Sequence, residues 1–128
     1  MPPMTVMIKP VSGRCNMRCA YCFYADEAAR RSVAAYGAMD ADTLEALVRR
    51  VFAYADGGVT MIFQGGEPTL AGAAYYRSLL ALERRYNGRG LPVRHALQTN
   101  GYDLSDELLE TLDEGRFLLG VSLDGCRE

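Results

Sequence analysis

The chain has 128 residues, of which 49% are hydrophobic and 23% are charged, and its net charge is -2 at pH 7. This composition predicts one globular domain, or a piece of one, and excludes a disordered chain or a strongly basic nucleic-acid-binding surface. The first ten residues contain no basic start and no long apolar run, so we expect no signal peptide and no membrane partner, and we expect a reducing cytoplasm as the compartment.

Strands and helices are predicted to alternate along the chain. Apolar runs predict four strands, at residues 5–11, 59–63, 93–99 and 117–123. Helical spacing with capping residues predicts three helices between them: Leu44 to Ala55, begun by Asp40 or Asp42 and stopped by Gly57; Ala73 to Tyr86; and Asp106 to Asp113, opened by Ser105 and closed by Gly115. This order predicts an α/β fold with a parallel sheet, either doubly wound or closed as a barrel, and the near-continuous apolar runs predict strands covered on both faces.

Chemically unusual residues follow each predicted strand. The segment "CNMRCAYC" (15–22) comes after the first, and the other strands run into "QGGEP" (64–68), "QTNG" (98–101) and "SLDG" (122–125). Any one glycine-rich turn is ordinary loop chemistry. Parallel α/β folds bind ligands at the carboxyl ends of their strands, so four such segments are expected to converge on one site.

Three of the four cysteines, Cys15, Cys19 and Cys22, lie within eight positions. A disulfide would leave one thiol over, and a structural zinc site needs a fourth ligand that neither His95, in mid-strand, nor the distant Cys126 supplies. A 4Fe-4S cluster held by three thiolates leaves one iron open to bind a small molecule. The cluster is therefore the favoured interpretation, with zinc second, while Cys126 and His95 are predicted to be structural.

The spacing Cys-x3-Cys-x2-Cys, with Tyr21 before the third cysteine, resembles the signature of radical S-adenosylmethionine (SAM) enzymes. The segments "IKPVSGRCNMRCAYCFY", "FQGGEPTL", "QTNGYDL" and "GVSLDG" resemble the first half of an anaerobic sulfatase-maturating enzyme. The resemblance implies that residues 1–128 are the first four strands of a partial (β/α)6 TIM-type barrel. The rest of the barrel and a cysteine-rich C-terminal domain would follow. It also implies an oxidoreductase that cleaves SAM with a 4Fe-4S cluster and oxidises a Cys or Ser of a sulfatase to formylglycine.

The same resemblance implies roles for individual residues. The cluster would be held by Cys15, Cys19 and Cys22. The expected SAM contacts are Tyr21, Gly65, Gly66, Glu67, Asn100 and Ser122, with the carbonyls of the "GGE" turn accepting from the SAM amino group. The expected peptide contacts are Tyr24, Gln64 and Gln98. The general base is expected beyond residue 128, and the expected partners are a sulfatase and an electron donor such as flavodoxin or ferredoxin.

Two other interpretations stay open. One is a maturase of another ribosomal peptide, built on the same barrel and the same cysteine-rich tail. The other is a non-catalytic, cluster-binding fragment, for which the end of the chain directly after the fourth predicted strand is the supporting feature.

Overall fold

A computed structural model describes residues 3–11, 39–102 and 104–122 of the chain. The four predicted strands are present: β1 (Met4–Ile8), β2 (Val59–Phe63), β3 (Val93–Thr99) and β4 (Leu118–Val121). The three predicted helices are α2 (Ala41–Tyr54), α3 (Gly72–Tyr86) and α4 (Asp106–Glu114), and a short 3-10 helix, η1 (Pro68–Ala71), precedes α3. The alternating α/β order expected from the sequence is confirmed.

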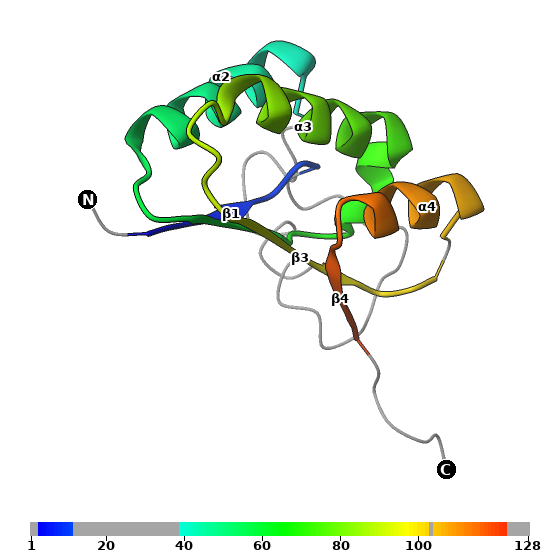
Figure 1. Cartoon of the computed structure of the whole chain (residues 1–128). Helices are drawn as coiled ribbons and strands as arrows, with labels where there is room; N and C mark the ends of the chain where they lie inside the picture. Colours follow the sequence, from blue (N-terminus) through cyan, green and yellow to red (C-terminus); the bar gives the residue numbers. More distant parts are fainter. Residues whose placement is uncertain (1–2, 12–38, 103, 123–128) are drawn as a thin grey trace, which may run out of the picture.

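The sheet is parallel throughout and its strands lie in the order β1-β2-β3-β4. A doubly wound sheet reverses its strand order at a switch point, and no reversal occurs among these strands. Helices α2, α3 and α4 all lie on the same face of the sheet (Figure 1). This arrangement is that of a barrel wall, so the structure decides between the two architectures that the sequence left open.

The prediction that the strands are covered on both faces is wrong for the described part of the chain. Met7, Ile62, Ala96 and Leu118 are partners in one row across the four strands, on the face opposite the helices. In this row Met7 is 57% exposed and Leu118 is 74% exposed. The apolar runs are continuous because both faces carry apolar side chains, although the described helices cover only one.

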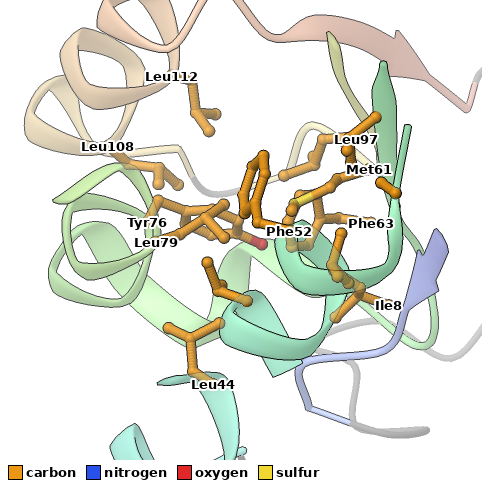
Figure 2. Close-up of a cluster of buried hydrophobic side chains, with 14 residues drawn as sticks. Ile8, Leu44, Phe52, Met61, Phe63, Tyr76, Leu79, Leu97, Leu108 and Leu112 are labelled. Atoms are coloured by element: carbon orange, nitrogen blue, oxygen red, sulfur yellow. The ribbon is translucent and has the colours of Figure 1, made fainter. Parts of the chain in front are cut away.

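The hydrophobic core lies between the three helices and the covered face of the sheet. Three alternate residues of β2 point into this core and are buried: Val59, Met61 and Phe63. Figure 2 shows their neighbours from the helices and from β1 and β3 gathered around them. The labelled side chains are Ile8, Leu44, Phe52, Met61, Phe63, Tyr76, Leu79, Leu97, Leu108 and Leu112.

Local capping residues begin the helices as the sequence predicts. The Asp40 carboxylate accepts from Thr43 N at 2.7 Å at the start of α2, and the Ser105 hydroxyl accepts from Leu108 N at 3.1 Å at the start of α4. These bonds satisfy backbone donors that have no partner within the helix. Gly115 ends α4, also as predicted.

Some element ends differ from the prediction. Strand β1 ends at Ile8, two residues before Pro10, because proline cannot donate to the ladder. Helix α2 ends at Tyr54 with Ala55 as its C-cap, so the chain leaves the helix before Gly57, which the sequence predicted to stop it. There the Arg89 guanidinium donates to the carbonyl oxygens of Phe52 at 2.7 Å and Ala55 at 2.5 Å, so a residue far along the chain satisfies the end of the helix.

His95 is buried in the middle of β3 and fully partnered. Its Nδ1 donates to the Gly115 carbonyl at 2.9 Å, its Nε2 lies 2.6 Å from Glu83 Oε1, and its ring stacks on Phe117 at 4.6 Å between centroids. Because Nδ1 carries a hydrogen for the carbonyl, a single further hydrogen lies between Nε2 and the carboxyl group. The structural role predicted for His95 is confirmed.

Charged side chains join α3 to both neighbouring helices. Arg84 pairs with Glu114 of α4 at 3.1 Å and Arg85 pairs with Glu45 of α2 at 3.4 Å. Such exposed pairs each contribute about 0–1 kcal/mol, so the packed core and not this surface holds the helices. None of the helices in the described ranges is long and apolar enough to cross a membrane.

Gly115 provides a test of the packing at the end of α4. A Cβ added there would lie 2.7 Å from the Phe117 ring and 2.9 Å from Leu80 Cδ2. Gly115→Ala should therefore lower the free energy of unfolding by about 1–3 kcal/mol, as overpacking does, in denaturant titrations. Gly88→Ala is the control, because Gly88 has no atom within 4 Å of the added Cβ and no positive φ. Equal stability of the two variants would contradict this packing.

Candidate functional site

The predicted site residues that the structure describes lie at the carboxyl end of the sheet. Gln64, Gly65, Gly66 and Glu67 follow β2, Gln98 and Asn100 lie at the end of β3, and Ser122 follows β4. The predicted cluster ligands and their neighbours, Cys15, Cys19, Cys22, Tyr21 and Tyr24, lie outside the described residues. No group of three or more His, Cys, Asp or Glu side chains suited to a metal ion occurs within the described ranges.

The turn after β2 begins beside the end of β1. Gln64 N donates to the Ile8 carbonyl at 3.0 Å, so the segment that leads to the cysteines leaves β1 next to this turn. Gly65 has φ 120°, a backbone conformation that residues with a Cβ rarely adopt. The turn then enters η1 at Pro68.

Glu67 is a buried carboxylate that joins the β2 turn to the end of β3. Its side chain is 1% exposed. It accepts from Thr99 Oγ1 at 2.5 Å, from Asn100 N at 2.9 Å, and from the Thr69 hydroxyl. Its own carbonyl accepts from Leu70 N at 3.1 Å within η1. The Glu67 side chain therefore faces the protein interior.

Tyr76 of α3 forms a hydrogen bond to the residue that follows Glu67. Its hydroxyl donates to the Pro68 carbonyl at 2.7 Å. Burial, with smaller contributions from Tyr75 and Glu67, raises the pKa of Tyr76 well above its ordinary value. The hydroxyl consequently keeps its proton and remains a donor to the turn.

The ends of β3 and β4 are joined by polar side chains. Gln98 Nε2 donates to Ser122 Oγ at 2.9 Å, and Ser122 N donates to the Thr99 carbonyl at 2.9 Å. The side-chain oxygen of Asn100 accepts from Tyr102 N at 2.9 Å, which closes a short turn after β3. Three of the predicted site residues are thereby held at one edge of the sheet.

A cavity of about 320 Å³ lies on the open face of the sheet, lined by the side chains of Gln64 and Gln98 and by apolar residues of β2, β3 and β4. Gly120 provides the space for Gln98, because a Cβ there would lie 2.2 Å from Gln98 Oε1. Two carboxamides above an apolar floor suit the hydrogen-bonding groups of a peptide backbone. A larger apolar cavity of about 780 Å³ lies between β1 and α2. None of the predicted site residues lines it, so it is not the candidate site.

The structure also identifies supporting residues that the sequence did not single out, Thr69, Thr99 and Tyr76. Thr99 follows Leu97 on the buried side of β3, so a hydroxyl occupies a position where the strand pattern predicts an apolar side chain. This polar residue at an apolar position is the sequence feature by which Thr99 could have been identified. Nothing local marks Tyr76 apart from other tyrosines in an amphipathic helix.

Comparisons with known proteins agree with this arrangement. The family model described as the radical SAM superfamily matches residues 10–128. The chain is 43% identical over its whole length to a cysteine-type anaerobic sulfatase-maturating enzyme of Clostridium perfringens, of which it covers 35%. It is 35% identical to a serine-type anaerobic sulfatase-maturating enzyme of Klebsiella aerogenes, with 96% of this chain and 30% of that protein aligned.

A solved structure is similar as well. Native anSMEcpe with bound AdoMet and Cp18Cys peptide matches with a TM-score of 0.89 and 41% identity, over 99% of this chain and 33% of that chain. The chain thus spans about a third of the length of the proteins that it matches.

Gly120→Ala should displace the Gln98 side chain and break its bond to Ser122. Because Gln98 is exposed and its end is flexible, we expect the free energy of unfolding to change by less than about 1 kcal/mol. The measurement is the nuclear Overhauser contact between the Gln98 side-chain amide and Ser122, which should disappear. A retained contact would show that the strand has room for a Cβ and would refute the geometry.

Proposed function

The chain belongs to the radical SAM superfamily, and from this premise we propose that it is the cluster- and SAM-binding part of an enzyme that oxidises a side chain of a sulfatase to formylglycine. The observation that carries the proposal is the sequence spacing of Cys15, Cys19 and Cys22, which follow β1 in the chain, together with the hydrogen bond that joins the end of β1 to the start of the β2 turn. Residues 1–128 would form the first four strands of the barrel, with further strands and the general base beyond them.

The donor set fits a 4Fe-4S cluster with one open iron. Three thiolates are the number that leaves such an iron without a protein ligand. The Gly65–Gly66 turn fits the amino group of SAM, since ammonium is a donor only and the carbonyls of the turn are acceptors. When bound, the cluster supplies the electron that cleaves SAM, which is the source of the oxidising radical.

The residues of this chain bind and orient in the proposed mechanism. The backbone of Tyr21 would border the adenine of SAM, and Gly65, Gly66 and Glu67 would hold its amino end through the turn. Asn100 and Ser122 would complete that contact at the ends of the third and fourth strands. None of these groups transfers a proton.

The peptide substrate would lie on the open face of the sheet. Gln64 and Gln98 line the cavity there, and their carboxamides would pair with the peptide backbone, while Tyr24 would contact the peptide from the cysteine segment. The greater identity to the cysteine-type relative, 43% against 35% for the serine-type one, favours a cysteine target. Relatives of both types favour the sulfatase over another ribosomal peptide as substrate.

The net reaction removes two electrons and two protons from the target residue. One electron would leave with the hydrogen atom that passes to the radical derived from SAM, and the second would pass to an iron-sulfur cluster of the cysteine-rich C-terminal domain that the resemblance implies. For cysteine, the Cβ is oxidised to the aldehyde level and water replaces the sulfur, which leaves as sulfide. A flavodoxin or ferredoxin would supply the electron that cleaves SAM. The cytoplasm is part of the proposal, because the three thiols must stay reduced to bind the cluster.

Loss of the thiols tests the cluster. Replacing Cys15, Cys19 and Cys22 together by Ala in the complete, anaerobically reconstituted protein should remove about four irons per chain, measured by iron analysis and electron paramagnetic resonance. Cys126→Ala is the matched control and should keep them. Zinc bound in place of iron by the parent protein would contradict the cluster.

Product analysis tests the reaction. The complete protein, given SAM and an electron donor without oxygen, should convert the target Cys of a sulfatase peptide to formylglycine, detected by mass spectrometry together with 5'-deoxyadenosine. The same peptide with Ala at the target position should stay unchanged. A cross-linked product instead would favour the maturase of another ribosomal peptide.

A further inference from the structure

The Glu67 carboxylate is bound on both sides by donors from segments far apart in the sequence. Thr69 donates from η1, two positions after Glu67, whereas Thr99 and the Asn100 backbone donate from the end of β3, more than thirty positions along the chain. An ionised carboxylate only accepts hydrogen bonds, and three donors reach this one. The side chain is 1% exposed, so its bonding is directed inward.

Thr99 has a fixed direction in this arrangement. Its Oγ1 accepts from Gly101 N at 3.1 Å and donates its single hydrogen to Glu67 Oε2 at 2.5 Å. Asn100 N donates to the other carboxylate oxygen, Oε1. The backbone N–H groups of two successive residues, Asn100 and Gly101, are therefore held directly or indirectly by Glu67.

Other bonds of the described residues join each of these two segments to a different element. Tyr76 holds the turn from α3, through the Pro68 carbonyl, and Ser122 N holds the end of β3 from the β4 side, through the Thr99 carbonyl. The almost fully buried Glu67 carboxylate thus joins the segment of the Gly65–Gly66 turn to Thr99 and Asn100 through hydrogen bonds.

We propose that Glu67 and Thr99 are positioning residues that together set the spacing between the glycine turn and the Asn100 loop. The pair binds SAM only indirectly, by holding at a fixed separation the two segments to which the proposed function assigns SAM contacts, and in this respect the inference rests on that function. Glu67 contributes to the site through the position it imposes and not through a bond from its carboxylate to the ligand.

The test uses two hydroxyls that donate to the same carboxylate oxygen. Thr99→Val removes the hydroxyl that donates to Glu67 from the end of β3, and Thr69→Val removes the hydroxyl that donates to it from the neighbouring η1. In the ligand-free complete protein, Thr99→Val should raise amide hydrogen exchange at Asn100 and Gly101 about tenfold, the effect of losing one hydrogen bond to a charged group. Thr69→Val should leave that exchange near the parent's, and Thr99→Ser, which keeps the hydroxyl, should restore it.

SAM affinity is the second readout. The dissociation constant of SAM, measured by equilibrium dialysis, should rise about tenfold in Thr99→Val, with the iron content unchanged, and should return toward the parent's in Thr99→Ser. If Thr99→Val fails to fold, Glu67→Asp replaces it, since this variant keeps the charge and shortens the reach to Thr99. Glu67→Asp should likewise raise amide hydrogen exchange at Asn100 and raise the dissociation constant of SAM.

Exchange that rises equally in the Thr69 and Thr99 variants, or that rises in neither, would overturn the proposal. Faster amide hydrogen exchange in Thr99→Val with an unchanged affinity for SAM would also overturn it, because the spacing of the two segments would then have no effect on SAM binding. A parent protein that does not bind SAM would refute the proposed function instead, and hydrogen exchange alone would then decide whether the pair holds the Asn100 loop.

Discussion

Parallel pairing of the four strands in chain order is the constraint on which the rest of the structure depends. It brings the carboxyl end of every strand to one edge of the sheet, and it requires a helical connection from each strand back to the start of the next. Helices α2, α3 and α4 lie on one face of the sheet, where they bury Phe63 and Leu97. On the other face lie the row from Met7 to Leu118, of which these two end residues are exposed, and the cavity beside Gln64 and Gln98.

The sequence predicted the features that depend on local chemistry. The bounds of β2 and β3 agree with the prediction because each apolar run is short and flanked by turn residues, and Asp40 and Ser105 begin their helices through bonds within four positions. Features set by distant partners were not predictable. The end of α2 depends on Arg89, and the covered face of the sheet depends on where the helices pack, whereas hydropathy reports only that Met7 and Leu118 are apolar.

The site was predictable to the same extent. Parallel strands require the glycine turn, the Gln98–Asn100 segment and Ser122 to meet, and they do. The direction of the Glu67 side chain was not predictable, because its partners Thr99 and Asn100 belong to another loop. An acidic residue after two glycines is equally compatible with a carboxylate that faces a ligand and with one that faces the core. Burial and hydrogen bonding separate the two cases.

The buried contact between His95 and Glu83 has an evolutionary consequence. Each side chain satisfies the other at 2.6 Å with almost no access to water, so losing either one leaves a buried polar group without its partner, whereas replacing both by apolar residues of similar volume is often tolerated. A lineage that changes this part of the fold must pass through an unstable intermediate or change both positions together. Positions 83 and 95 should therefore co-vary among relatives, with the acid and the imidazole inherited or lost as a unit.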